Sequence, residues 1–343
     1  MKSGQRHTSG WRCRLRSLAS CLLLLCSALF LSCEYKELCY DHNHWATVKV
    51  TFDWEFAPEA LTRADNAPAA SLGMTVLFYN METPGAEPIR YDYGPEGGTA
   101  RLDPGTWRAV CYNYNTETIL YRGMDYWDRL EAFTRYSSIE EGTGLTRSGM
   151  PRARGTENEP VILEPDPLWG CASEPFELEA NDRDVELVLK PAHRFITITV
   201  NILNVPNLKY TGQFSGAMSG LAPSRWIASG GVGDGLVTEA FTGKVTGESS
   251  LQMVFRIFGH CPQLEEGEEN THLFTCYAIL ADESKWYYTV DVTNLIHKAT
   301  HGDADEDITI EIDGLPVPKP IVNGSGFQPT VDSWQGVEID VGM

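Results

Sequence analysis

Apolar and polar residues alternate along the segment 46–56, ATVKVTFDWEF. Every even position is apolar and every odd position is polar, a period of two that matches a half-buried strand and no helix. We therefore predict a strand over 46–56, with one face toward a core. Similar runs predict further strands at 74–78, 107–114, 185–189, 196–202, 251–258, 274–280, 287–292, 308–312 and 337–341.

Helical patterns are rare in the same sequence. Apolar spacing favours a helix over 125–136, DYWDRLEAFTRY, and a short one over 293–299, TNLIHKA. Turn-forming clusters separate the strands, such as DPG at 103–105 and SGGVGDG at 229–235. Strands separated by turns of this kind are typical of antiparallel β-sandwiches, so the sequence predicts an all-β fold.

The chain is long for a single hydrophobic core. It has 343 residues, and single cores stop growing at about 250–300 residues, so two domains are expected. Within 182–205, two strand patterns are interrupted by Lys190 and Pro191, and proline does not sit inside a central ladder. We therefore predict two tandem sandwiches, over 46–190 and 191–343.

Residues 1–32 have the pattern of an export signal. Basic residues without any acid precede an apolar run over 17–32, as in the n-region and h-region of a signal peptide. A run of about 16 residues is shorter than the roughly 20 that a membrane-spanning helix needs. The end of this run, FLSC at 30–33, resembles the bacterial lipobox. This resemblance predicts cleavage between Ser32 and Cys33.

The modification predicted for Cys33 is lipidation. The lipidated cysteine of a bacterial lipoprotein carries three acyl chains. Each buried CH₂ stabilises membrane binding by about 0.8 kcal/mol, and two or more chains anchor a protein stably. Phe30 stands where the lipobox usually has Leu, so the alternative is an unmodified cysteine in an ordinary signal peptide. With the lipid in place, residues 33–45 form a short tether between the membrane and the first strand. The acids of EYKE, 34–37, resemble the acidic export signals of surface lipoproteins, and this resemblance implies the outer face of the outer membrane rather than the periplasm.

Removal of the signal peptide makes the chain strongly acidic. The full sequence has 27 Lys and Arg against 47 Asp and Glu, a net charge of −20. Residues 1–32 contain five basic residues and no acid, so the net charge without them is −25. Such a surface repels phosphate groups, which argues against nucleic acid as a partner. It suits an exported, soluble body.

The mature chain keeps further cysteines besides Cys33, at wide spacings. They are Cys39, Cys111, Cys171, Cys261 and Cys276, with no C-x-x-C pair. This spacing disfavours a zinc site. Cys111 and Cys276 lie on apolar strand patterns and are predicted to be buried thiols. Alternatively, Cys261 and Cys276 are close enough in sequence to form a disulfide in an oxidising compartment.

Signals for catalysis or for a cofactor are weak. His42 and His44 offer metal ligands in the tether, although a polar linker explains them better. The acids of HGDADED, 301–307, alternate like the start of a calcium loop, but the glycine and glutamate that complete this motif are missing. The sequence contains no G-x-S-x-G elbow. It therefore predicts no enzyme, no cofactor and no metal.

Three segments carry a resemblance to a known family. They are SCEYKELCYDHNH at 32–44, ARLDPGTWRAVCYNYNTETILYRG at 100–123 and GSGFQPTVDSWQGVEIDV at 324–341. In this order they resemble the fimbrillin-associated anchor lipoproteins of Bacteroidales, exported proteins at the base of fimbriae. The resemblance implies two tandem transthyretin-like sandwiches, a lipid anchor at Cys33 in the outer membrane, and binding to fimbrial subunits by strand addition.

Strand addition implies a sheet edge beside an apolar groove, which an extended segment of a partner fills. The residues of the two terminal strands that are candidates for this exchange are Val48, Val50, Phe52, Trp54, Val337, Ile339 and Val341. In shaft subunits of the family, cleavage after an arginine removes the first strand. Cleavage after Arg63 in this chain would release the body from Cys33, so we expect the chain to keep its first strand.

The nine tryptophans support an alternative function, a surface glycan-binding lipoprotein of a polysaccharide-utilisation system. Trp54 and Trp107 occupy the apolar phase of their strands and are predicted to be core residues. The undecided tryptophans are Trp45, Trp127, Trp226, Trp286 and Trp334. An exposed coplanar row of aromatic rings would favour glycan binding, whereas an open sheet edge beside an apolar groove would favour fimbrial assembly.

Overall fold

The computed structural model describes residues 45–54, 73–145, 149–183, 185–260, 270–299, 307–320 and 333–339. Strands make up 51% and helices 7% of the chain, which confirms the predicted all-β class. Each predicted strand overlaps an observed one, although the first ends at Phe52. Within the described part of the chain, no helix is both long and apolar enough to cross a membrane.

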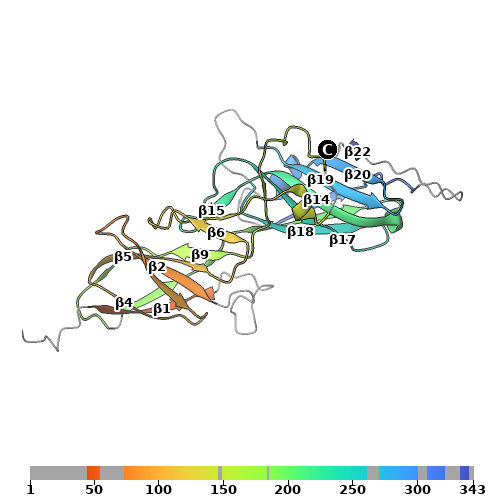
Figure 1. Ribbon diagram of the computed structural model, residues 1–343. Coiled ribbons are helices and arrows are strands. Elements are labelled where there is room, and N and C mark those ends of the chain that lie inside the picture. Colours follow the sequence, from red (N-terminus) through yellow and green to blue (C-terminus); the bar gives the residue numbers. More distant parts are fainter. Residues whose placement is uncertain are drawn as a thin grey trace, which may run out of the picture. The chain divides into compact units, whose positions relative to one another are not determined.

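The N-terminal strands form two sheets (Figure 1). The first has the order β11-β1-β4 and consists of Val185–Leu189, Ala46–Phe52 and Gly98–Leu102. The second has the order β12-β9-β5-β2-β3, with β10 paired to β5; its strands are Ala192–His193, Trp169–Ala172, Gly105–Asn113, Met74–Asn80, Ile89–Tyr93 and, for β10, Phe176–Leu178. The alternating residues of β1 and β4 share one buried cluster between these sheets with Met74, Val76 and Phe78 of β2.

Gly97 permits the tight connection from β3 to β4. It has a φ of 86°, a left-handed conformation that favours glycine. A Cβ at this position would lie 2.0 Å from the carbonyl oxygen of Val50 in β1. A larger residue therefore could not occupy the turn while β1 stays beside β4.

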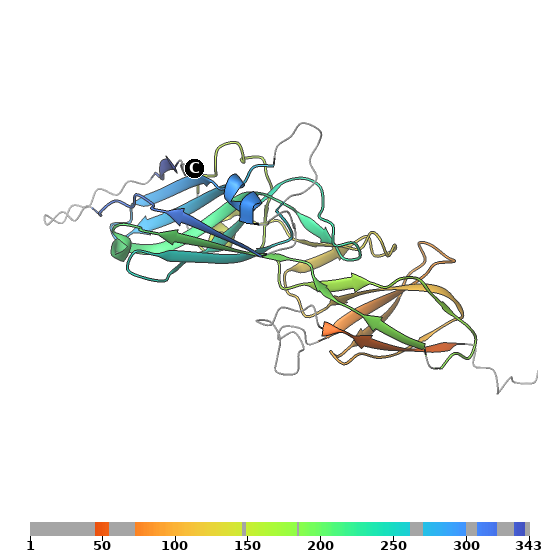
Figure 2. The same cartoon turned by 180° about the vertical axis from the view of Figure 1, so that it is seen from behind.

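The C-terminal strands form a four-stranded and a six-stranded sheet. The four-stranded sheet has the order β17-β18-β13-β21 and consists of Lys244–Val245, Leu251–Ile257, Ile196–Leu203 and Ile308–Asp313. The six-stranded sheet has the order β22-β20-β19-β14-β16-β8 and consists of Gln335–Ile339, Lys285–Asp291, Leu273–Leu280, Thr211–Leu221, Val237–Thr242 and Val161–Ile162. Figure 2 shows these strands from the opposite side.

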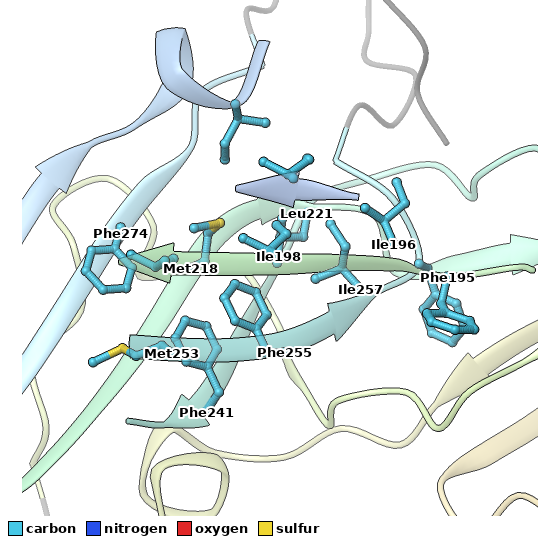
Figure 3. Close-up of a cluster of buried hydrophobic side chains, with 14 of the residues drawn as sticks. Phe195, Ile196, Ile198, Met218, Leu221, Phe241, Met253, Phe255, Ile257 and Phe274 are labelled. Atoms are coloured by element: carbon cyan, nitrogen blue, oxygen red, sulfur yellow. The ribbon is translucent and has the colours of Figure 1, made fainter. Parts of the chain in front are cut away.

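Side chains from these two sheets meet in a common core (Figure 3). Along β13 every second residue is buried, as the alternation in the sequence predicts. The rings of Phe241, from the six-stranded sheet, and Phe255, from the four-stranded sheet, stack with centroids 3.6 Å apart. This arrangement of two facing sheets around an apolar layer is a β-sandwich.

The helix predicted over 125–136 is wrong. Glu131–Thr134 is strand β7, which lies between β6, Ile119–Arg122, and β15, Ser224–Trp226, in a small antiparallel sheet. The apolar spacing that imitates a helix has a different cause, because Leu130 and Ala132 are buried in the core cluster. Pairing with a strand about 90 residues later in the sequence overrides the local helical pattern.

Two short α-helices and one 3₁₀ helix, Leu208–Tyr210, are present among the described residues. The predicted helix at 293–299 is observed as α3, Thr293–Ala299. The other, α2, Ile139–Thr143, was not predicted. It begins at Ser138, whose side chain accepts a hydrogen bond from the Glu141 N–H, and ends at Gly144 in the left-handed conformation.

Sheet membership changes close to the predicted domain boundary. β12, at Ala192–His193, pairs with β9 of the first half, and β13, from Ile196, pairs with β18 and β21 of the second. In contrast, the short strand β8 precedes the boundary in sequence yet pairs with β16. The division at residues 190 and 191 therefore stays a prediction.

Candidate functional site

The first strand, β1, is paired along both of its edges. It runs parallel to β11 and antiparallel to β4, so that Val48 lies opposite both Val185 and Ala100. Val48 and Val50 are fully buried. Because β1 has a neighbouring strand on each side and its apolar face packs against the core, this strand is an integral part of its sheet.

The end of the first strand is held by contacts beyond the ladder. The rings of Phe52 and Trp54 pack with centroids 5.8 Å apart, and Trp54 Nε1 donates a hydrogen bond to the Pro95 carbonyl oxygen at 3.1 Å. Both rings are half-buried. The four candidate residues of this strand therefore all contact the N-terminal core or its rim.

The last strand, β22, pairs only with β20 among the described strands. The two strands run parallel, with Val337 opposite Tyr288 and Ile339 opposite Val290. Val337 and Ile339 are half-buried against the core, whereas the alternate residues Gly336 and Glu338 are exposed. β22 is thus an edge strand with an alternating, half-buried face (Figure 1).

Two aromatic contacts define the register at the start of β22. The ring of Trp334 packs edge to face against Tyr277, with centroids 5.5 Å apart. Gly336 lies under the Tyr287 ring, since a Cβ at this position would be 2.3 Å from the Tyr287 hydroxyl oxygen. A residue with a side chain at this point would have to displace that ring.

The opposite edge of the same six-stranded sheet is closed by polar contacts. Arg152 donates a hydrogen bond to Thr238 Oγ1 at 2.7 Å, and this hydroxyl donates to Glu159 Oε2 at 2.8 Å. β8 covers β16 here through the pairs Thr238 to Val161 and Glu239 to Ile162. The two edges of the sheet therefore differ in chemistry as well as in pairing.

Glu239 is a buried carboxyl group beside this closed edge. It is 1% exposed, and burial raises its pKa well above the ordinary value, with a further increase from the nearby Glu164 and an opposing effect of Arg256. Arg256 instead pairs directly with Glu164 at 2.7 Å. The fold thus favours the protonated, neutral form of Glu239.

A cleft of about 610 Å³ lies beside the β15-β7-β6 sheet. Its lining includes the exposed side chains of Leu120 and Tyr136 together with Arg122. Arg122 forms an ion pair with Glu131, and the Arg122 Nε to Glu131 Oε2 distance is 2.6 Å. Burial raises the pKa of Glu131, but hydrogen bonds from Arg122 and Ser224 outweigh it and lower this pKa overall.

The tryptophans are mostly buried or partly buried. Trp107 is 4% exposed, which confirms its predicted core position, and Trp54 is half-buried. Trp127, Trp226, Trp286 and Trp334 are likewise half-buried. Trp45 is 41% exposed, and the Arg101 guanidinium lies over its ring.

The cysteines agree with the prediction of buried thiols. Cys111 and Cys276 are fully buried. Cys111 lies directly opposite Cys171 across β5 and β9, with Sγ atoms 3.4 Å apart. Burial raises the pKa of Cys111, whereas the hydrogen bond with Cys111 lowers the pKa of Cys171. The sequence spacing did not predict this pairing across the sheet.

Several residues named in the sequence predictions lie outside the described residues. They are Ser32, Cys33, His42, His44, Arg63, Cys261 and Val341. Cleavage, lipidation and exchange at these positions stay predictions.

Residues 32–242 match a family described as "Domain of unknown function (DUF5119)". The match spans more than half of the sequence. The chain belongs to this family. Membership in this family identifies related sequences, whereas individual proteins and solved structures supply relatives with described roles.

The chain resembles, over nearly its whole length, a protein with a described role. The chain is 24% identical over 341 residues to an inferred fimbrium anchoring subunit, Fim4B of Bacteroides ovatus. The match covers 91% of this chain and 94% of the relative. This relative confirms the resemblance to fimbrial anchor proteins that the three sequence segments predicted.

A further comparison concerns solved structures. The crystal structure of an inferred adhesin from Bacteroides ovatus superimposes with a TM-score of 0.55 and 21% identity, covering 80% of this chain and 94% of that one. The fimbrial anchor protein Mfa2 from Porphyromonas gingivalis gives a TM-score of 0.44 at 12% identity, covering 78% and 90% of the two chains. The first of these shows that the fold of this chain is shared with the adhesin.

Proposed function

We propose that this protein is a fimbrial anchoring or assembly subunit of the cell envelope, with a structural rather than a catalytic task. The observation that carries the proposal is the end-to-end match to an inferred fimbrium anchoring subunit, over 91% of this chain and 94% of the relative. A match of this extent spans nearly the whole length of both proteins. The role of a relative is therefore transferred to the whole chain rather than to one module.

Attachment to the membrane is assigned to the lipid predicted at Cys33. The acyl chains supply the stable membrane binding that an anchor needs. The body then consists of two tandem, transthyretin-like sandwiches, over 46–190 and 191–343, that follow the tether. The predicted location is the outer face of the outer membrane, and the partners are fimbrial subunits and outer-membrane lipid.

Contact with a fimbrial subunit is assigned to the edge formed by β20 and β22. Among the described strands β22 has one neighbour, and its half-buried residues Val337 and Ile339 occupy an apolar strip. A partner strand with the same alternation would pair with the β20 backbone and fill this strip. β1 is the poorer candidate for exchange, because its removal would unpair two strands at once.

The anchoring role is tested in bacteria that carry this protein. Cys33→Ala is expected to move the processed protein from the detergent-rich to the aqueous phase and to release fimbriae into the culture medium. Cys39→Ala is the matched control, since it alters a neighbouring cysteine without removing the lipid site. Fimbriae that stay attached to cells carrying Cys33→Ala would contradict the proposal.

The exchange edge is tested separately with a chain that ends at residue 332 and thus lacks β22. A labelled peptide of residues 332–343 is expected to bind this shortened chain at least about tenfold more tightly than the full chain, whose edge is occupied. A peptide with Val337→Asp and Ile339→Asp should not bind, because both charges would face the apolar strip. A peptide with Glu338→Lys should bind normally. Equal binding of all three peptides would refute this edge.

A further inference from the structure

Three histidine rings from three separate elements meet in the C-terminal sandwich. His260 follows β18 of the four-stranded sheet, His272 directly precedes β19 of the six-stranded sheet, and His297 lies on α3. Each ring offers one nitrogen atom, and these three atoms all lie within 4.8 Å of one another. We propose that His260, His272 and His297 bind one divalent transition-metal ion, with Zn²⁺ as the preferred ion.

The distances suit a metal after small movements. Zinc binds imidazole nitrogen at about 2.0–2.1 Å with tetrahedral geometry, which places two ligand nitrogens about 3.4 Å apart. Contraction from at most 4.8 Å to this value takes a shift of less than about 1 Å per ring. The ring planes are inclined to one another at 64°, 46° and 86°. The rings are therefore not stacked, which leaves their edges free to converge on an ion.

His272 is the ligand that most needs a metal. It is fully buried, and neither of its ring nitrogens makes a hydrogen bond to any described residue. Buried polar atoms without partners are rare and costly. One nitrogen of a neutral imidazole ring carries a lone pair that can bind a metal.

The backbone at His272 and His260 is held by hydrogen bonds to other residues of the chain. The Thr293 hydroxyl oxygen accepts a hydrogen bond from the His272 N–H at 2.8 Å, and the His272 carbonyl accepts one from Val292 at 2.9 Å. These bonds join the start of β19 to the turn that enters α3. The His260 carbonyl accepts a hydrogen bond from Asn270 Nδ2 at 2.8 Å. The ligands are thus presented by a fixed frame.

Space for the buried ring is provided by Gly220. It adopts a φ of 79°, and a Cβ at this position would lie 2.0 Å from the Thr271 carbonyl oxygen and 3.1 Å from His272 Nδ1. The strand β14 therefore approaches the His272 ring closely only because position 220 has no side chain.

The ligand set indicates which ions fit. Imidazole nitrogen suits zinc, copper and nickel, whereas magnesium and calcium prefer oxygen ligands. His297 is exposed, so the fourth coordination position faces solvent and takes a water molecule. The ion would link β18 of one sheet, β19 of the other and α3. We therefore assign it a stabilising task, as a cross-link within the sandwich.

The test uses the full-length protein without a histidine tag, stripped of metal with a chelator. Zn²⁺ titration followed by calorimetry and elemental analysis is expected to show one tightly bound ion per chain and a rise of several degrees in melting temperature. Co²⁺ should give a visible ligand-field band typical of nitrogen coordination. Ca²⁺ at the same concentration should neither bind tightly nor raise the melting temperature.

The ligand assignment is tested at the exposed histidine, whose replacement spares the core. His297→Ala is expected to weaken zinc binding at least about tenfold. Mutation of a residue that only hydrogen-bonds a metal ligand already costs about tenfold in affinity, so loss of a ligand should cost at least as much. His193→Ala, at a half-buried histidine of β12, should bind zinc as the unmodified protein does. Stoichiometric tight binding that survives His297→Ala, or no tight binding by the unmodified protein, would overturn the proposal.

Discussion

The first and last strands of this protein share a sequence pattern but differ in their structural surroundings. Both alternate apolar and polar residues, as in Val48 to Val50 and Val337 to Ile339. β1 lies between two strands with Val48 and Val50 fully buried, whereas β22 has one neighbour among the described strands and a half-buried face. The comparison teaches that alternation identifies a strand but does not say how firmly the fold holds it.

The difference has a clear energetic origin. Full burial of a valine side chain stabilises a fold by roughly 1.5–3 kcal/mol, and half-burial by correspondingly less. β1 also satisfies backbone groups of both β4 and β11, while β22 satisfies those of β20 alone. Loss of β1 would therefore disrupt a whole sheet, and loss of β22 would only expose an edge.

The largest expected effect comes from a charge placed in each strand. Val50→Asp should lower the free energy of unfolding by more than about 3 kcal/mol, because it buries an unpaired carboxylate. Val337→Asp should cost less than about 1.5 kcal/mol, since the new carboxylate stays near solvent. Urea denaturation of both variants measures the two costs. Similar losses in the two variants would remove the distinction between a fixed and a replaceable strand.

A smaller effect is expected from Glu239, near the closed edge opposite β22. Its raised pKa means that the folded chain keeps a proton that the unfolded chain loses above about pH 4.5. Stability therefore falls as the pH rises from there through the folded-state pKa. Glu239→Gln should remove this loss and stabilise the protein by at least about 1 kcal/mol at pH 8.

Melting temperatures of this variant and of the unmodified protein across pH 4.5 to 8 provide the measurement for Glu239. The advantage of the glutamine variant in melting temperature should grow with pH, because glutamine has no carboxyl proton to lose. Glu164 and Arg256 around the site are the same in both proteins and therefore do not cause the difference. Glu338→Gln, on the exposed face of β22, is the matched control and should show no such trend. An advantage that shrinks with rising pH would show that Glu239 is charged in the folded protein.

The smallest effect is expected from the ion pair between β1 and β11. Lys49 Nζ lies 3.0 Å from Glu186 Oε1, with the two side chains 62% and 65% exposed. Solvent screens such pairs, so Lys49→Ala should change stability by less than about 1 kcal/mol. The same denaturation measurement tests it. A large loss would mean that charge, rather than burial, holds β1 in its sheet.

Much of the fold was predictable because period-two alternation is a local property. It located strands such as β1, β13 and β21 from neighbouring residues alone. The helix predicted over 125–136 failed for the opposite reason. Its residues form β7, which pairs with β15 in the second half of the chain, and local spacing contains no trace of that partner.

The candidate site was only partly predictable. The sequence identified both terminal strands, but their neighbours decide which one is an edge. It directed attention to His42 and His44, whereas the structure brings together His260, His272 and His297. These three residues follow no metal-binding spacing, because two of them flank strands of different sheets and the third lies on a helix.

The sequence by itself determined the all-β class, most strand positions, the acidic charge and the family resemblance, since each follows from residue types or from short-range order. Tertiary structure alone decided which strands are central, that Glu239 is buried with a raised pKa, and that three distant histidines converge. The physical reason is that pairing, desolvation and ligand convergence depend on residues far apart in the chain, which only the folded backbone brings together.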